Sequence, residues 1–485
     1  MSKISKNKSK MVYLHMVIGL FLMFIFGRVV PPIYPLTDVG MQIVGVFLGA
    51  IWLWCFVGLL WPSLLMLIAF GLTDFAPFPQ IVASAFGGAV PTLLLFSMIL
   101  FGSPEHVGAT NYITRWFLSR KIFNNRPIVF SFIFIFATYV LSVAVNVTPA
   151  LILMWSVLYS VLRELKYKPG EKYSTLMIIG TFLGAISGQA SLPFRGSTLA
   201  IVSAFETTSE MTMPPLEYIL LGFIMSVTVF IVYCLFMKFI FRPDMSKVAN
   251  VNTEMFNKDP LPPMSKLQKA NFYSLLAFVF IMLLPSFLPD DFIIAEVIDG
   301  LQPVGVAILI IGIMCLVKFK GQPLLDFQTV AAKSVNWEVY IFVVASMAIS
   351  GALTNEATGI LEMLIIVFEP VLGGHSPIML FIVILLIAIF ITSFASSMVI
   401  GIAFMPVLIT FGAEAGANLP AMAATTILLL HYSIILPSAS AFAAMLWGNE
   451  DWLTSKEVFK YGAWVVAFAV AVAIGIIMPI SLILF

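Results

Sequence analysis

The sequence predicts an all-α polytopic membrane protein with about 11 transmembrane helices in two inverted repeats, each with a re-entrant helical hairpin and a broken helix. Its composition, the placement of its basic residues and the recurrence of short landmarks predict this class. Of 485 residues, 61% are hydrophobic and 10% are charged, and the mean hydropathy is +1.06. Soluble domains are about half apolar and about a quarter charged, so most of this chain is expected to lie in a bilayer.

The apolar runs set the number of crossings. Runs long enough to cross about 30 Å of hydrocarbon recur over residues 13–485. The basic residues 1–10 are not followed by a cleavage site of small residues, so residues 1–37 are expected to form a cytoplasmic segment and an uncleaved first transmembrane helix. The three cysteines lie in apolar segments, where neither disulfides nor metal ligands are expected. No basic run with interleaved aromatic residues indicates nucleic-acid binding.

Lysine and arginine gather in a few loops. They cluster in residues 1–10, 115–126, 163–172, 242–269, 318–333 and 456–460, whereas residues 29–114 and 334–455 hold none. By the positive-inside rule the basic loops are cytoplasmic. We therefore expect a multi-pass protein of the inner membrane, with the N-terminus cytoplasmic and the C-terminus external.

Two apolar segments do not fit a simple crossing. Residues 127–162 are long enough for two passes but have basic loops on both sides, and a polar stretch with a proline, residues 142–149, lies near their centre. This pattern predicts a hairpin that enters and leaves from the cytoplasm. Residues 376–412 have a similar small, polar centre but carry His375 and Glu414 at their flanks, so this hairpin is expected to enter from outside.

Other landmarks recur in the same order. Ser97-Met98 matches Ser346-Met347, and Leu192-Pro193 matches Leu436-Pro437, at intervals of about 250 residues. Because the two hairpins face opposite sides, the duplication is expected to be inverted, as in many secondary transporters. We assign residues 38–241 to the first repeat, 242–269 to a cytoplasmic linker and 270–485 to the second repeat.

A broken helix is expected after each hairpin. In residues 174–206 a stretch rich in Gly and Ser, with Pro193, interrupts the apolar run, and Pro437 interrupts residues 419–448. Backbone groups freed by such breaks are tolerated in a membrane only if protein, water, ions or a solute satisfy them. We expect two hairpin tips and two breaks to converge, so that helix N-termini and hydroxyls hold carboxylate oxygens.

This order of elements resembles the divalent anion sodium symporter (DASS) family of the ion-transporter superfamily. The closest local match is residues 436–448, Leu-Pro-Ser-Ala-Ser-Ala-Phe-Ala-Ala-Met-Leu-Trp-Gly, which is similar to that family's Leu-Pro-x-Ala-Thr-Pro-Pro-Asn-Ala stretch. The resemblance covers nearly the whole chain. It implies a homodimer, elevator-type alternating access, and a carboxylate or sulfate substrate between the tips.

The tips depart from the family's usual Ser-Asn-Thr. Here they read Asn146-Val147-Thr148 and Ser396-Ser397-Met398, so fewer side-chain oxygens are available for sodium. The resemblance implies a substrate site at Asn146, Val147, Thr148, Arg195, Gly196, Ser197, Thr198, Ser396, Ser397, Pro437, Ser438, Ala439 and Ser440. If transport is coupled to sodium, which would be the only cofactor, it implies a cation site at Asn146, Gly188, Ser191, Ser396 and Ala439.

Two ionisable residues near the breaks have alternative roles. An arginine at membrane depth costs at least about 2.5 to 3.5 kcal/mol on insertion scales. Arg195 has two expected roles. In the first it neutralises the substrate anion or replaces a sodium ion beside it, which would favour exchange over symport. In the second it has a structural function, in which it caps backbone carbonyls or pairs with a carboxylate. His431 would either couple transport to protons or serve as a hydrogen-bonded packing residue.

These features favour a secondary transporter of a small organic anion of the di- or tricarboxylate class, working by sodium symport or anion exchange. An enzyme is not expected, because no His-Glu-x-x-His motif or acidic pair falls within a span. A cation–proton antiporter of similar architecture is the alternative, but such exchangers need buried carboxylates, and the acids here lie almost entirely in loops.

Overall fold

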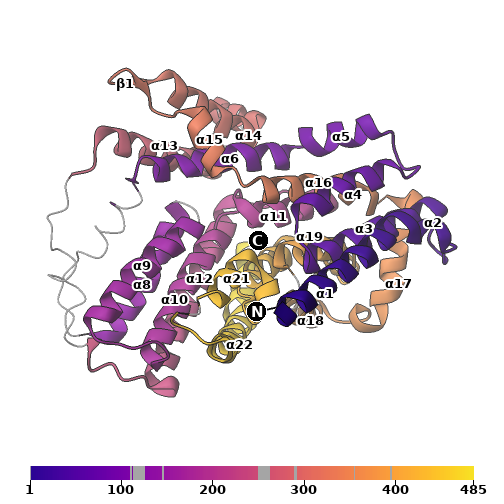
Figure 1. Ribbon diagram of the computed structural model, residues 1–485. Coiled ribbons are helices and arrows are strands. Elements are labelled where there is room, and N and C mark those ends of the chain that lie inside the picture. Colours follow the sequence, from indigo (N-terminus) through magenta and orange to yellow (C-terminus); the bar gives the residue numbers. More distant parts are fainter. Residues whose placement is uncertain are drawn as a thin grey trace. The chain divides into compact units, whose positions relative to one another are not determined.

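The structure is a computed structural model that describes residues 2–109, 112, 126–144, 147–248, 263–288, 292–353, 355–393, 396–449 and 451–485. These residues are overwhelmingly helical (Figure 1). The one sheet among them is an antiparallel pair, β1 (Lys318–Phe319) and β2 (Gln322–Pro323). The predicted all-α polytopic class is confirmed.

The described chain divides into two compact units. The first comprises residues 1–95, 199–213 and 336–423, and the second comprises residues 96–198, 214–335 and 424–485. Both units draw on both halves of the sequence, so each is built from segments far apart along the chain.

The first unit holds the N-terminal helices and the second hairpin. Ser376 caps α18 by accepting a hydrogen bond from the backbone N–H of Met379, and Pro377 occupies the first turn, as helix starts favour. Helices α18 and α19 pack against each other. The elements are α1 (Ser2–Phe21), η1 (Leu22–Phe26), α2 (Gly27–Val29), α3 (Asp38–Phe56), α4 (Leu60–Gly71), α5 (Phe78–Gly87), the start of α6 (Ala89–His106), most of α11 (Gly196–Ser209), α16 (Trp337–Leu353), η7 (Glu356–Thr358), α17 (Ile360–Leu372), α18 (Pro377–Thr392), α19 (Ser397–Glu414) and the start of α20 (Leu419–Leu430).

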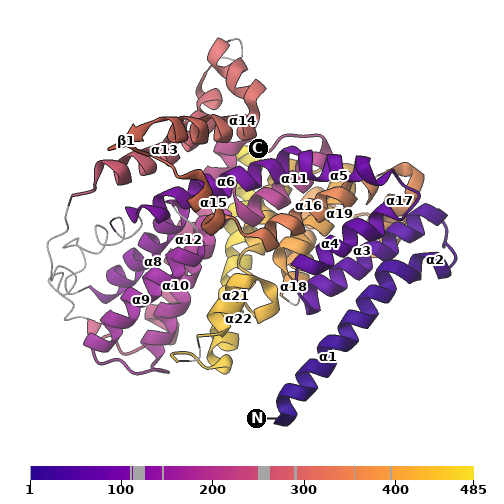
Figure 2. The same ribbon diagram turned by 45° about the horizontal axis from the view of Figure 1, so that its top comes forward.

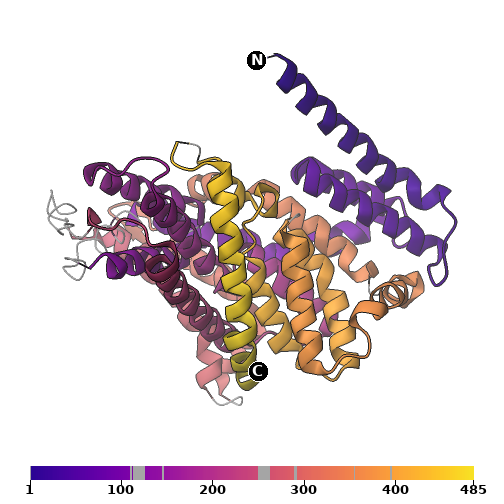
Figure 3. The same cartoon turned by 90° about the horizontal axis from the view of Figure 1, so that it is seen from below.

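The second unit holds the first hairpin and the C-terminal helices. Its last helical stretch, drawn in yellow, runs to the C-terminus (Figure 3). The elements are the end of α6, α8 (Pro127–Ala144), α9 (Val147–Glu164), α10 (Lys172–Ala190), α12 (Pro215–Phe236), η3 (Met237–Phe241), α13 (Lys266–Leu283), η6 (Leu284–Phe287), α14 (Ile293–Leu316), α15 (Phe327–Ser334), the end of α20, η8 (Pro437–Ala439), α21 (Ala441–Trp447), α22 (Ser455–Val472), η9 (Ala473–Ile477) and α23 (Met478–Leu484).

Helix α10 is the core of the second unit. Every residue from Tyr173 to Ala190 is buried, and α8, α9, α12 and α22 pack around it (Figures 1 and 2). Gly180, Gly184 and Gly188 recur every four residues, which lets helix backbones approach closely. A Cβ added at Gly184 would lie 2.3 Å from the carbonyl oxygen of Ile135 on α8. The broken helix is therefore held directly against the first hairpin.

Eight helices among the described residues are long and apolar enough to span a membrane. The count rises to nine if α17 and α18, bent by 103° at a short break, form one span. Four shorter apolar helices accompany them: Leu60–Gly71, Gly300–Leu316, Trp337–Ile349 and Leu419–Leu430. The prediction of about 11 transmembrane helices therefore counts shorter helices together with full-length spans.

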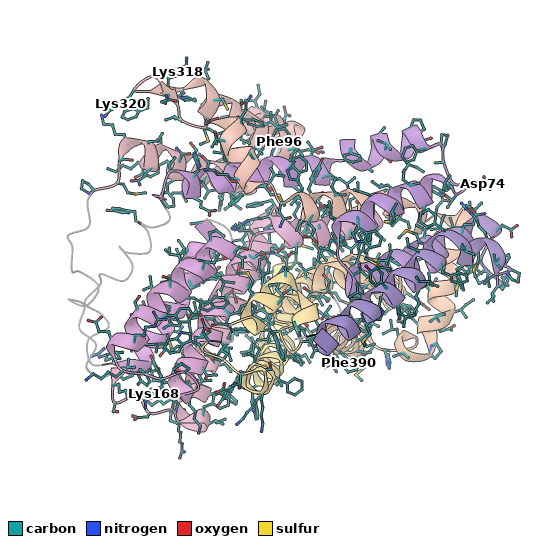
Figure 4. All side chains as sticks on the ribbon, viewed as in Figure 1. Asp74, Phe96, Lys168, Lys318, Lys320 and Phe390 are labelled. Atoms are coloured by element: carbon teal, nitrogen blue, oxygen red, sulfur yellow. The ribbon has the colours of Figure 1, made fainter. Side chains whose placement is uncertain are left out.

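Some charged residues lie in the connections between helices. Figure 4 labels Lys168, Lys318 and Lys320, all of which lie outside the helices. The predicted linker at residues 242–269 lies partly outside the described residues. The repeat boundaries, the inverted relation of the halves and the sidedness of the termini stay predictions.

Candidate functional site

The site is built around the break between α10 and α11. Helix α10 ends at Ala190, and the buried residues 191–195 lead into α11 at Gly196. Gly196 has a φ of +53°, a left-handed conformation that favours glycine, and a Cβ there would lie 3.3 Å from Nε2 of Gln189. The turn at Gly196 therefore brings the start of α11 back over the last turn of α10.

Arg195 joins this break to the first hairpin. Its Nη1 donates to the carbonyl oxygens of Ser142 and Val143, at 2.6 and 3.0 Å. These carbonyls belong to the last turn of α8, where the helix provides no backbone donors and its dipole is negative. The guanidinium thus caps the helix that leads to the hairpin tip, as one of its two expected roles requires.

The rest of the guanidinium is enclosed but incompletely paired. Arg195 is only 4% exposed, and its carbon Cζ lies 4.8 Å from the ring centre of Phe101 on α6. Among the described residues no carboxylate forms an ion pair with it, and its buried Nη2 has no hydrogen-bond partner. A buried positive charge with an unused donor is a favourable position for an anion.

The second break lies beside the first. Residues 431–436 separate α20 from η8 and α21. Nε2 of His431 lies 3.2 Å from Oγ of Ser197 and 3.1 Å from Oγ1 of Thr198. Gln189 donates from Nε2 to Oγ of Ser197 at 2.5 Å. Sequence reasoning placed these two breaks together, and the second unit contains both.

A buried group of hydroxyls ties the two breaks together more deeply. The hydroxyls of Ser187 and Tyr432 lie 2.8 Å apart. Tyr139 on α8 donates to Oγ of Ser191, which itself donates to the carbonyl oxygen of Ser187. In this structure protein groups therefore engage the hydroxyl of Ser191, a predicted sodium ligand.

The remaining predicted residues have different surroundings. Val147 is buried and Thr148 is exposed at the start of α9, and Ser440 caps α21 by accepting from the N–H of Ala443. Gly188 packs closely against α8, since a Cβ there would lie 2.6 Å from the carbonyl oxygen of Tyr139. Pro437 is exposed and Ala439 is buried in η8.

Ser396 and Ser397, both partly exposed, belong to the first unit, so their approach to the other residues stays a prediction. Asn146 and the side chain of Ser438 lie outside the described part.

Gln189 and Tyr432 were not expected in the site. Both adjoin segments whose breaks the sequence does reveal, so their positions offered a signal. The contact of Gln189 depends on the turn into α11, and that of Tyr432 depends on how the second break lies against α10. The capping carbonyls of Ser142 and Val143 carry no sequence signal, because every residue has such a group. Among the residues that the structure describes, no cluster of three or more His, Cys, Asp or Glu side chains is arranged to hold a metal ion.

The chain is similar to a family of known proteins. A family model described as citrate transporter, CitMHS, matches residues 47–430. The matched region includes both hairpins, the first break, Arg195 and all of α20. No curated protein matches the chain.

Proposed function

The chain belongs to the CitMHS citrate-transporter family, a part of the ion-transporter superfamily, and on that premise we propose that it is a secondary active transporter of a di- or tricarboxylate such as citrate. Family membership supports movement of a small anion across a membrane and favours transport over catalysis. The substrate within the carboxylate class, the coupling and the mechanism are parts of the proposal.

The unpaired nitrogen of Arg195 is the observation that carries the proposal. A buried arginine is ordinarily satisfied by a carboxylate or by backbone oxygens, and here two carbonyls use Nη1 while Nη2 has no partner. A substrate carboxylate would satisfy Nη2 by a charge-assisted hydrogen bond. Arg195 would then hold the substrate with one nitrogen and the first hairpin with the other.

The start of α11 supplies further donors. Gly196, Ser197 and Thr198 form the first turn of this 14-residue helix, where backbone N–H groups lack partners within the helix and the dipole favours negative charge. Gly196 and Ser197 are partly exposed, whereas Thr198 is buried. Arg195 directly precedes this helix, so the two sets of donors that we propose for the substrate are adjacent in the chain.

Transport would be coupled either to sodium entry or to exchange for a second anion. The hydroxyl of Ser191 already donates to the carbonyl of Ser187 and accepts from Tyr139, and Arg195 provides a fixed positive charge near the substrate. Both observations favour exchange. Likeness to the DASS family extends the proposal to a homodimer in the inner membrane and to elevator-type movement.

Uptake by proteoliposomes tests the proposal and its coupling. Labelled citrate is supplied with or without an inward sodium gradient and with or without internal citrate, and unlabelled succinate serves as the competitor. We expect uptake that requires internal citrate and is reduced by succinate. Dependence on sodium instead would establish symport, and absence of citrate uptake under every condition would contradict the proposed substrate.

A further inference from the structure

The hydroxyls at the start of α11 are engaged by an imidazole nitrogen in this structure. Ser197 and Thr198 both lie within hydrogen-bond distance of Nε2 of His431. These hydroxyls belong to the same first turn of α11 whose backbone N–H groups the proposed function assigns to a carboxylate. His431 therefore occupies the position of a competitor for the substrate's hydrogen bonds.

The direction of these hydrogen bonds follows from the partners. Nδ1 of His431 lies 2.9 Å from the carbonyl oxygen of Ile427, which can only accept, so Nδ1 carries a proton. In the neutral imidazole Nε2 is then an acceptor. Oγ of Ser197 accepts from Gln189 and so directs its own proton toward Nε2.

Thr198 has two acceptors within reach. Its Oγ1 lies 3.2 Å from the carbonyl oxygen of Gln189 and 3.1 Å from Nε2 of His431. A single hydroxyl proton can satisfy either acceptor, so a small rotation of the hydroxyl exchanges one for the other. Rotation toward a third acceptor nearby needs no change in the backbone.

We propose that His431 is a positioning residue that holds the hydroxyls of Ser197 and Thr198 in the substrate-free protein, and that a carboxylate of the transported anion replaces the imidazole as their acceptor. This inference rests on the proposed function. A carboxylate accepts more strongly than a neutral nitrogen because its hydrogen bonds are charge-assisted. Residue 431 is partly exposed, as are Gly196 and Ser197.

The exchange would loosen one of the hydrogen-bonded links that hold the second break in the described structure, and leave another in place. His431 links the second break to the start of α11, whereas Tyr432 links it to α10 through Ser187. When the substrate displaces the imidazole, the first link opens and the second remains. Anion binding would thereby change how the start of α11 is held without separating the second break from α10.

Two substitutions of His431 separate acceptor chemistry from bulk. His431→Leu removes the acceptor, whereas His431→Gln retains an amide oxygen that can lie near the position of Nε2. Citrate dissociation constants are measured by calorimetry on the purified full chain, and turnover is measured in proteoliposomes. We expect His431→Leu to bind citrate roughly three- to tenfold more tightly, as exchange of about one hydrogen bond implies, and to turn over more slowly. His431→Gln should bind like the wild type.

A double-mutant cycle identifies the hydroxyls as the cause. In a Thr198→Val background His431→Leu should increase the affinity for citrate by a smaller factor, because one of the two hydroxyl donors that it releases is absent. His431→Met, with a flexible apolar side chain, replaces His431→Leu if the latter fails to fold. Unchanged or weaker citrate binding in both folded variants would overturn the inference, since a merely structural histidine would not restrain affinity. Wild-type protein that binds no citrate would instead refute the proposed function, and this inference with it.

Discussion

At the scale of single residues, the two terminal nitrogens of Arg195 have different surroundings. Nη1 donates to two carbonyls of α8, whereas the buried Nη2 has no hydrogen-bond partner and is the donor that we propose for the substrate. Replacing Arg195 should therefore weaken substrate binding through Nη2 and lower stability through Nη1. A variant that keeps a donor for the carbonyls of α8 but lacks the positive charge separates these two effects.

Arg195→Gln is expected to raise the citrate dissociation constant about ten- to 100-fold. This range corresponds to a lost hydrogen bond to a charged group, about 1.5 to 3 kcal/mol, while the glutamine amide retains a donor for the carbonyls of α8. The measurement is calorimetric titration of citrate into purified protein. Arg163→Gln is the matched control, because Arg163 is an exposed cation in the last turn of α9. Equal affinity in both variants would rule out Arg195 as the substrate's counter-charge.

At the scale of elements, the glycines of α10 make the packing of the broken helix against the hairpin testable. Gly184→Ala would place a Cβ 2.3 Å from a backbone oxygen of α8, and backbone cannot move aside as a side chain can. We expect a loss of stability of about 1 to 3 kcal/mol, seen as a lower melting temperature in size-exclusion chromatography of heated samples. Gly312→Ala on α14 is the control, since nothing lies within 4 Å of its added Cβ. Equal melting temperatures for the two variants would contradict the close approach of α8 and α10.

The ion pair beside the first hairpin should matter little. Nζ of Lys247 lies 3.0 Å from Oε2 of Glu171, but the side chains are 34% and 31% exposed. Exposed pairs of this kind contribute about 0 to 1 kcal/mol. Lys247→Gln should therefore lower the free energy of unfolding by less than about 1 kcal/mol in a denaturant titration. A larger loss would show that the linker's contacts, which include the carbonyl of Lys166, stabilise this region more than its exposure implies.

The sequence predicts elements here better than contacts. Apolar run length and Pro193 or Pro437 reveal spans and breaks because both act locally on the chain. The contact of Gln189 with Ser197 depends instead on the turn at Gly196, and that of His431 with Thr198 depends on how the second break lies beside the first, which no local pattern encodes. Arg195 was recognisable because burying a charge is costly. That it caps α8 was one of two expected roles, and only the packed structure shows the capped carbonyls.

At the scale of the whole molecule, the loops set the orientation. The basic loops predict a cytoplasmic N-terminus and an external C-terminus. Alkaline phosphatase, which is active only outside the cytoplasm, is expected to be active when fused after Phe485 and inactive when fused after Lys247. The reverse pattern of activities would contradict the assigned sidedness, and activity at both points would contradict an odd number of crossings between them.

Counterflow distinguishes a carrier for citrate-type anions from a leak or a channel. Proteoliposomes are loaded with unlabelled citrate and diluted into a trace of labelled citrate without any ion gradient. A carrier that has released internal citrate on the outside binds labelled citrate there and carries it inward. We therefore predict a transient accumulation of labelled citrate inside the vesicles above its equilibrium level. Empty liposomes control for leakage. Label that never exceeds the equilibrium level, in vesicles shown to contain folded protein, would contradict the carrier account.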